Sequence, residues 1–425
     1  MTDTIFALSS GAPPAAIAVV RISGPRAGAA LAALAGQLPA PRRAVSATLR
    51  DADGETLDRA LVLWLPGPGT ATGEDTAELH CHGGRGVVAA VEAALSALPG
   101  LRRAEPGEFT RRAFANGKID LAEAEGLADL LTAETDLQRR AAQAMAGGAF
   151  SRQVEGWRER LLHASAAVEA VLDFGDEDDV AELPDSFGQV LGELHAELAE
   201  WLTRPRAEVL REGFRVVLAG PPNSGKSTLF NDLVESEAAI TAPLAGTTRD
   251  VVTRSVALAG VPFTFVDTAG LRENAGDEVE AIGVERAHAA VAGGDLVLWL
   301  GEEGAGPTGA WEIEAQIDRN SGAAKRDPRR RVSAVTGAGM DGLRTDLVAT
   351  ARVAMPRPGE AALNARQHCL LARAEAALSA ATDLPDPLLI AESLRLARVA
   401  FDALLGRTTT EDMLDALFGR FCIGK

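Results

Sequence analysis

The sequence predicts a fold of the α/β plus all-α class, in which an α/β domain comes first and a second α/β domain interrupts a helical one. Strand-like apolar runs alternate with helix-forming stretches in two separate parts of the 425 residues. Alternation of this kind is typical of a sheet covered by helices. The stretches that follow each α/β part repeat leucine and alanine at helical spacing, which indicates packed helices.

The predicted domain boundaries follow these changes of pattern. Residues 1–118 form the first α/β domain, residues 119–211 and 356–425 form the helical domain, and residues 212–355 form the inserted domain. The inserted part begins with βαβ alternation, which implies a parallel, doubly wound sheet. An insertion between two neighbouring helix ends is physically easy because closing a longer loop costs little extra entropy.

The composition is that of a globular protein and excludes several classes. No apolar stretch reaches the about 18 residues that a membrane helix needs. The first residues lack the basic start and apolar run of a signal peptide. The three cysteines are widely spaced and odd in number, which argues against a disulfide framework or a zinc cluster. These features favour a cytoplasmic protein without a membrane span.

The overall charge is acidic, with 42 Lys and Arg against 60 Asp and Glu and a formal net charge of −18. Such a chain repels phosphodiester backbones, which disfavours tight autonomous binding of nucleic acid through a basic face. Short arginine pairs occur, but each is more often a solvated surface pair than a binding site. The net charge alone does not decide whether the protein has an RNA partner.

A phosphate-binding loop is the clearest chemical signal in the inserted domain. Residues 220–227, Gly-Pro-Pro-Asn-Ser-Gly-Lys-Ser, follow an apolar strand and open a helix. The glycines let backbone N–H groups close around phosphate oxygens at the positive end of a helix. Lys226 supplies charge to the β- and γ-phosphates, and the Ser227 hydroxyl is placed for Mg²⁺.

Two further segments indicate that the bound nucleotide is a triphosphate. Val266-Asp-Thr-Ala-Gly270 is a strand that ends in an acid, so Asp267 can hold Mg²⁺ through water and the Gly270 N–H can sense a γ-phosphate. Gly246-Thr-Thr-Arg-Asp250 suits a switch loop, with Thr248 completing the Mg²⁺ shell. The three segments in this order predict a GTPase of the translation-factor class.

The base-reading elements are weaker, because a guanine-specific Asn-Lys-x-Asp is absent. Asp318 follows a strand-like run and is the preferred acid for the guanine N1 and N2 donors, while residues 324–327, Ala-Lys-Arg-Asp, are a rival. Residues 331–334 resemble the loop whose backbone contacts guanine O6. Both acid candidates lack the asparagine, so we expect reduced guanine selectivity or affinity.

These arguments give one set of candidate nucleotide ligands. The candidate GTP-binding residues are Asn223, Ser224, Gly225, Lys226, Ser227, Thr228, Thr247, Thr248, Asp267, Thr268, Ala269, Gly270, Asp318, Ser333 and Ala334. Ser227 and Thr248 are the candidate Mg²⁺ ligands, and Lys226 is also a catalytic candidate.

Motifs in the terminal regions narrow the family. They are Val20-Arg-Ile-Ser-Gly24, Thr72-Gly-Glu-Asp75, His80-Cys-His-Gly-Gly84, Pro106-Gly-Glu-Phe-Thr110, Asn116-Gly-Lys-Ile-Asp120 and the terminal Phe421-Cys-Ile-Gly-Lys425. Together with the nucleotide motifs, they resemble the MnmE (also called TrmE) family of tRNA-modification GTPases over the whole chain. The four-segment order of the sequence matches that family.

The resemblance implies a homodimer with an N-terminal folate-binding domain, a helical domain and an inserted Ras-like G domain. It implies that a flavin-dependent partner (MnmG, also called GidA) joins it in a heterotetramer to modify carbon 5 of the wobble uridine, position 34, of certain tRNAs. A 5-formyl- or methylene-tetrahydrofolate would supply the one-carbon unit. By motif match, the folate-contacting residues are Arg21, Glu78, Lys118 and Lys425.

The resemblance also implies hydrolysis that depends on K⁺ and on dimerisation of the G domains. By motif match, K⁺ would be held by Asn223, Ala242, Leu244 and Thr247, and Glu280 would orient the attacking water. K⁺ beside the β–γ bridge can neutralise the charge that an arginine finger would otherwise meet. A loop one residue longer before Glu280 leaves its neighbouring acids as alternatives for that role.

Three points stay open or depart from the family. A Gly-rich segment, residues 301–309, replaces the crossover helix expected in a G domain and should leave one sheet face less covered. Cys422 is either a reactive thiol near the folate or a small apolar residue. Two other functions compete with the first: a GTP-switch factor for ribosome assembly, and a folate-dependent one-carbon transferase with an accessory GTPase.

Overall fold

The structure is a computed structural model that describes residues 3–174, 183–235, 252–268, 292–319, 324–408 and 410–425. The chain divides into two compact units, residues 1–128 with 402–425, and residues 129–401. The predicted α/β plus all-α class is confirmed, while the boundaries at 118, 211 and 356 stay a prediction. Among the described residues, no helix is long and apolar enough to cross a membrane.

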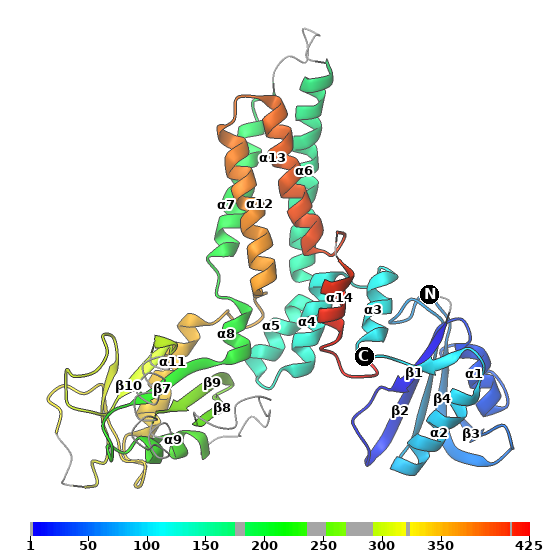
Figure 1. The fold of residues 1–425 in the computed structure, drawn as a ribbon, viewed down its shortest axis with the longest axis horizontal. Helices are drawn as coiled ribbons and strands as arrows, with labels where there is room; N and C mark the ends of the chain where they lie inside the picture. The colour runs from blue at the N-terminus through cyan, green and yellow to red at the C-terminus, as the bar shows by residue number, and fades with distance from the viewer. Residues whose placement is uncertain (1–2, 175–182, 236–251, 269–291, 320–323, 409) are drawn as a thin grey trace, which may run out of the picture. The chain divides into compact units, whose positions relative to one another are not determined.

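The first unit is built on a six-stranded sheet with the order β3-β4-β5-β2-β1-β6 (Figure 1). Its strands are β1 (Thr4–Leu8), β2 (Ala15–Ser23), β3 (Val45–Arg50), β4 (Thr56–Leu65), β5 (Thr76–Gly83) and β6 (Leu101–Arg103). Its helices are α1 (Ala27–Ala35), α2 (Arg85–Ala97), α3 (Glu108–Ala115), α14 (Glu411–Phe418) and most of α4 (Leu121–Thr132). The pairs are antiparallel except β1 with β6.

Alternation along these strands separates two faces of the sheet. Val20 and Ile22 on β2 and Leu79 on β5 are fully buried in one core with residues of α1 and α2. Successive side chains of a strand point to opposite faces. Arg21 and Glu78, which are register partners on β2 and β5, therefore project from the other face.

The C-terminal residues belong to this first unit. Leu414 and Phe418 of α14 pack with Leu121 of α4. Beyond α14, Ile423 pairs with Pro106 in an antiparallel bridge. Gly424 has a φ of 96°, and a Cβ there would come within 2.1 Å of the Leu8 carbonyl oxygen, so only glycine fits this approach. The tail is thus packed against the end of β1.

The second unit begins with a helical bundle. Its helices are α5 (Asp136–Ala146), α6 (Ala149–Phe174), α7 (Phe187–Leu202), α8 (Ala207–Glu212), α12 (Ala365–Asp383) and α13 (Pro387–Leu404). Figure 1 shows α6, α7, α12 and α13 running side by side. Trp157, fully buried, makes an edge contact with Trp201 at 5.8 Å and stacks on Phe401 at 6.1 Å between ring centroids. This aromatic cluster joins helices from both sides of the inserted segment.

The inserted segment forms a second six-stranded sheet with the order β12-β11-β10-β7-β9-β8. Its strands are β7 (Phe214–Ala219), β8 (Val252–Leu258), β9 (Val261–Asp267), β10 (Leu296–Trp299), β11 (Trp311–Glu314) and β12 (Arg330–Arg331). Every pair is parallel except β8 with β9, as the βαβ pattern predicted. Helices α9 (Lys226–Glu235) and α11 (Met340–Ala354) contribute to the core on one face.

The missing crossover helix between β10 and β11 is confirmed, because residues 300–310 contain only turns and bends. A glycine-rich loop covers the Trp299 indole in its place. A Cβ on Gly301 or on Gly306 would come within 2.6 Å of that ring. The indole Nε1 donates to the Glu302 carbonyl oxygen at 2.8 Å. Glycine thus lets the loop lie flat where a helix would otherwise cover the sheet.

Candidate functional site

The carboxyl ends of four neighbouring parallel strands meet at one edge of the second sheet. Strand β7 pairs with β9 up to Leu218 and Asp267, and with β10 up to Ala219 and Trp299. Strand β11 continues the same direction beyond β10. In open α/β sheets, ligands bind at this edge. The loops that follow β7, β9 and β11 carry the predicted nucleotide residues.

The phosphate-binding loop connects β7 to α9. Gly220 has a φ of 152° and Gly225 a φ of 92°, while Asn223 also adopts a left-handed φ of 62°. A Cβ on Gly220 would come within 3.1 Å of the Gly301 backbone nitrogen. The glycines therefore allow both the turn and its close packing against the end of β10.

Lys226 lies at the first position of α9 and is only 6% exposed. Its Nζ donates to the carbonyl oxygens of Gly220 at 3.0 Å and Pro221 at 2.7 Å. The ammonium group therefore lies over the beginning of the loop. From there its charge is available to phosphate oxygens held by the loop's N–H groups.

The described residues also fit a hydrated Mg²⁺ ion. Asp267 ends β9 and is 4% exposed, while Ser227 lies in the first turn of α9. Carboxylate and hydroxyl oxygens are the ligands that Mg²⁺ prefers. The Ser224 hydroxyl is buried and has no hydrogen-bond partner in the described part of the chain. The loop thus keeps an unused donor beside the place where phosphate oxygens are expected.

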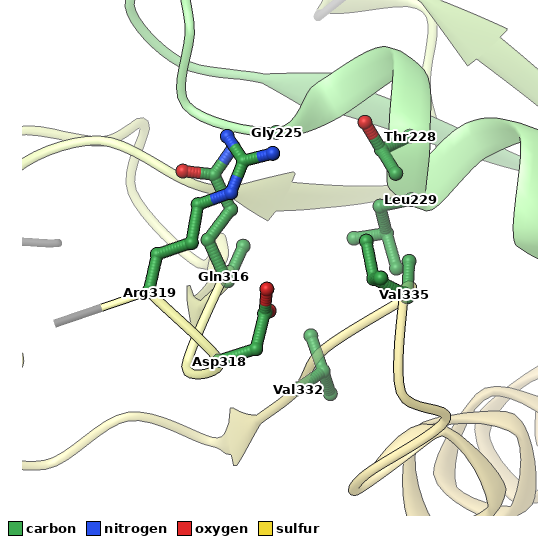
Figure 2. Close-up of a pocket in the computed structure, with 10 residues that line it drawn as sticks. Gly225, Thr228, Leu229, Gln316, Asp318, Arg319, Val332 and Val335 are labelled. Carbon is green, nitrogen blue, oxygen red and sulfur yellow. The ribbon is translucent and has the colours of Figure 1, made fainter. Parts of the chain in front are cut away.

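A pocket opens beside the phosphate-binding loop (Figure 2). Its lining residues are Gly225, Thr228, Leu229, Ala315, Gln316, Asp318, Arg319, Val332, Ala334 and Val335. Figure 2 shows that Asp318 and Arg319 come from the turn after β11, facing Thr228 and Leu229 on α9. Apolar walls with one carboxylate suit a flat, hydrogen-bonding ring such as a purine.

Asp318 is held in this pocket by the segment after β12. The Ser333 hydroxyl donates to Asp318 Oδ1 at 2.5 Å. This hydrogen bond holds the pKa of Asp318 below its ordinary value. The carboxylate therefore stays ionised, as an acceptor for two N–H donors, to a lower pH than a free aspartate would.

Replacing Ser333 by alanine should raise the Asp318 pKa toward its ordinary value, and it also removes the acceptor of the Thr336 backbone N–H. GDP binding that depends on the ionised carboxylate should then be lost at a higher pH as the solution is acidified, within about pH 5 to 3. Titrating the GDP dissociation constant against pH measures this shift. Ser255→Ala, which removes a hydroxyl paired with Thr264 in the same unit, is the control. If Ser333→Ala and the unmodified protein lose GDP affinity over the same range of acidic pH, the Ser333 hydroxyl does not lower the Asp318 pKa.

The rival acid segment lies elsewhere. Lys325 is buried and pairs with Glu312 at 2.5 Å, and its Nζ also donates to the Trp299 carbonyl oxygen at 2.7 Å. The Asp327 backbone N–H donates to Glu303 at 2.9 Å. This segment therefore fastens the loop after β10, and neither Lys325 nor Asp327 lines the pocket.

Several predicted residues lie outside the described residues. They are Ala242, Leu244, Thr247, Thr248, Ala269, Gly270 and Glu280. Thr268 is described, and its hydroxyl donates to the Leu218 carbonyl oxygen at 2.8 Å. Its side chain thus fastens the end of β9 to β7.

Sequence reasoning missed Gln316 and Arg319 as pocket residues. The signal in the sequence was their position on either side of Asp318. The three residues share a turn in which the Arg319 N–H donates to the Gln316 carbonyl oxygen at 2.9 Å. Both side chains line the same pocket as Asp318. Turn geometry, not residue type, brings them there.

In the first unit, Arg21 and Glu78 form one connected group. Arg21 Nε and Nη2 donate to Glu78 Oε1 at 3.1 and 3.0 Å, and His80 Nε2 lies 3.1 Å from Oε2. Burial alone would raise the pKa of Glu78, but the His80 hydrogen bond and the Arg21 charge outweigh it and hold the pKa below its ordinary value. His80, unforeseen from the sequence as a partner of Glu78, is revealed by strand register, since residues two apart share a face.

Lys118 and Lys425 do not join this pair directly. The Lys118 side chain lies against Gly73, where an added Cβ would be 3.2 Å from its Cε. Lys425 ends the tail that is packed against β1. Neither lysine is hydrogen-bonded or ion-paired to Arg21 or Glu78 within the described residues of this unit.

The two cysteines of the first unit differ in exposure. Cys81 is buried, and burial together with the nearby Asp58 charge raises the pKa of its thiol to about 12, so it is not a thiolate near neutral pH. Cys422 is exposed in the tail. The two interpretations of Cys422 stay open.

Comparison with known proteins decides the family. The family model for the GTP-binding protein TrmE N-terminus matches residues 4–118, and that for the MnmE helical domain matches residues 121–422. The chain belongs to the MnmE (TrmE) family of tRNA-modification GTPases. It is accordingly a GTPase, with the Mg²⁺ and nucleotide binding of that class.

Full-length relatives carry the same family name. The chain is 65% identical to the tRNA modification GTPase MnmE of Novosphingobium aromaticivorans and 64% identical to that of Erythrobacter litoralis, covering 100% of both chains in each case. It is 59% identical to that of Rhizorhabdus wittichii, over 100% of this chain and 97% of the relative. The MnmE resemblance in the sequence is thereby confirmed.

Proposed function

We propose that this GTPase acts with a flavin-dependent partner (MnmG/GidA) to modify carbon 5 of the wobble uridine of certain tRNAs. A tetrahydrofolate derivative supplies the one-carbon unit, and the chain works as a homodimer within a heterotetramer. The observation that carries the proposal is the ion-paired carboxylate Glu78 on a sheet face free of α1 and α2, in a chain that also holds a nucleotide pocket.

Glu78 is the residue best suited to read a pterin ring. Arg21 occupies one carboxylate oxygen and His80 the other, so the group is fixed in orientation and ionised. Oε1 already accepts two donors from Arg21, whereas Oε2, with His80 as its partner, retains a lone pair for an N–H donor of the ring. Lys118 and Lys425 provide cations for the glutamate tail in the same unit.

Hydrolysis is assigned to the residues around the phosphate-binding loop. Lys226 stabilises the charge that develops on the β- and γ-phosphates, and Ser227 with Thr248 and Asp267 holds Mg²⁺ directly or through water. Mg²⁺ supplies positive charge to the β- and γ-oxygens when bound. Glu280 orients the attacking water.

The remaining residues are assigned to binding of K⁺ and of the guanine base. Asn223, with Ala242, Leu244 and Thr247, would hold K⁺, which would supply the positive charge that an arginine finger otherwise provides when the G domains of two copies meet. Asp318 accepts from guanine N1 and N2, and the Ser333–Ala334 backbone faces guanine O6. The pocket in Figure 2 supports this orientation of the nucleotide.

The proposal predicts that Glu78→Gln weakens binding of 5-formyltetrahydrofolate to the full chain by about 10- to 100-fold, the scale of losing hydrogen bonds to a charged group. Isothermal titration of the purified protein measures the change. Glu92→Gln is the matched control, because it removes a carboxylate paired with Arg103 on the helix-covered side. Absence of folate binding by the unmodified protein would reject the modification function, and equal binding by Glu78→Gln would reject the role of Glu78.

A further inference from the structure

A fully buried arginine of the first unit binds the carboxylates of three residues. Arg112, on α3, donates from its guanidinium to Glu74 Oε2 at 3.1 Å, to Asp3 Oδ1 at 2.9 Å and to Glu108 Oε1 at 3.0 Å. A buried charge that loses a partner is costly, so these carboxylates are held around it. Arg112 therefore ties α3 to the chain before β1 and to the loop before β5.

The loop before β5, residues 66–75, is anchored through the same glutamate. Glu74 Oε2 also accepts from the Ser23 hydroxyl at 2.8 Å, and that hydroxyl lies 2.7 Å from Thr72 Oγ1. Ser23 and Thr72 are both buried. The network fixes the loop against the end of β2, where Ser23 is the last residue.

Lys118 lies between the two segments that Arg112 joins. Its side chain crosses the loop at Gly73, where an added Cβ would be 3.4 Å from Cγ and 3.2 Å from Cε. Asn116, at the end of α3, donates from Nδ2 to the Thr72 carbonyl oxygen at 2.7 Å and holds the two segments together. The described residues provide the Lys118 ammonium with no hydrogen-bond or ion-pair partner. Its charge is therefore held over the loop and is available to an anion.

The loop places this lysine within reach of a ligand at Glu78. Thr76 and Glu78 lie two residues apart on β5 and share a face of the sheet. The loop with Gly73 leads directly into Thr76, and the five residues from Gly73 to Glu78 span at most about 18 Å. An extended aminobenzoyl-glutamate tail on a ring at Glu78 covers a comparable distance.

We propose that the Arg112–Glu74 ion pair positions Lys118 for the anionic tail of the ligand that Glu78 binds. The inference rests on the proposed function, in which that ligand is a tetrahydrofolate derivative. By joining α3 to the loop, the pair keeps Gly73 under the lysine stem and orders the ammonium group before the ligand arrives. Ordering a flexible side chain in advance removes that entropy cost from binding. Arg112 is buried and acts only through Lys118.

Two ligands separate the tail from the ring. They are 5-formyltetrahydrofolate and its dimethyl ester, in which both tail carboxylates are neutral. Glu74→Gln removes the charge of the pair but keeps the size of the side chain. We expect it to weaken the acid by about three- to tenfold, the cost of immobilising one flexible side chain, and to leave the affinity for the ester unchanged. Isothermal titration of the full-length protein measures both dissociation constants.

Gly73→Ala tests the contact between the loop and the lysine. The added methyl group would meet the Lys118 stem, and it should weaken the acid selectively by a similar factor. Alanine is also strained at Gly73, where φ is 78°. Gly54→Ala is the matched control, because Gly54 has a φ of 85° and an added Cβ there meets nothing within 4 Å. This control should bind both ligands as the unmodified protein does.

Lys118→Ala shows whether these changes act through the lysine. It should abolish the preference for the acid over the ester, and Glu74→Gln should weaken the acid no further in that background, since changes that act through one group are not additive. Equal weakening of acid and ester by Glu74→Gln would assign the pair a structural role and overturn the inference.

The remaining outcomes separate the inference from the proposed function. If Lys118→Ala loses the preference for the acid while Glu74→Gln and Gly73→Ala retain it, the positioning role alone is overturned. If the unmodified protein binds acid and ester equally, the tail contact and the inference fail while folate binding stands. If it binds neither ligand, the proposed function itself fails.

Discussion

Replacing Lys226 by alanine is expected to weaken GDP and GTP binding by about 100-fold or more, since one buried ammonium group is lost from a phosphate site. The residue is 6% exposed and has its Nζ over the loop, so its charge is held beside the loop in a position largely shielded from water. The carbonyl groups of Gly220 and Pro221 also lose their donor. Isothermal titration with GDP measures the effect.

A second buried lysine provides the control for this experiment. Lys325→Met removes an ammonium paired with Glu312 in the same unit but outside the pocket. We expect that variant to unfold at a lower temperature while still binding GDP when folded. Wild-type affinity in Lys226→Ala would show that the loop does not bind phosphate as described.

Replacing K⁺ by Na⁺ is expected to reduce the rate of GTP hydrolysis by about 100-fold, the scale of losing one stabilising charge in the transition state. The proposed ligand Asn223 lies at the tip of the phosphate-binding loop, where its side chain is exposed. Na⁺ has a smaller radius than K⁺, so ligands that suit K⁺ would hold it less well. The initial rate of phosphate release in matched salts measures the effect.

Asn223→Gly is the variant that tests the ligand itself. Glycine adopts the φ of 62° found at this position without strain, so the loop keeps its conformation while the side-chain oxygen is removed. We expect its rate to be low and equal in K⁺ and Na⁺. If the unmodified protein hydrolyses GTP at the same rate in both salts, K⁺ has no role in hydrolysis. If K⁺ still stimulates hydrolysis by Asn223→Gly, other residues and not the Asn223 side chain bind the ion.

The phosphate-binding loop was predictable because its chemistry is local. Between Gly220 and Ser227 the spacing of glycines, lysine and serine itself dictates which backbone groups and side chains meet a phosphate, given a strand before and a helix after. The reduced cover after β10 was predictable for a similar reason, since residues 301–309 contain too many glycines to form a helix.

The pocket beside the phosphate-binding loop was only partly predictable. Asp318 and the segment 324–327 were both possible acids in the sequence, and each follows an apolar run. The structure distinguishes them because β11 ends at the same edge as β7, which brings Asp318 beside Gly225 and Thr228. Lys325 instead turns into the protein and pairs with Glu312.

The sequence by itself therefore determined the family, the two α/β parts and the phosphate-binding loop. Only the tertiary structure decided which groups separated along the chain lie in contact: Gln316 with Asn223, Glu78 with Arg21, and Gly424 with Leu8. The physical reason is the separation along the chain between the residues that interact. A motif fixes the conformation of its own few residues, whereas these contacts depend on strand order, register and the packing of distant segments.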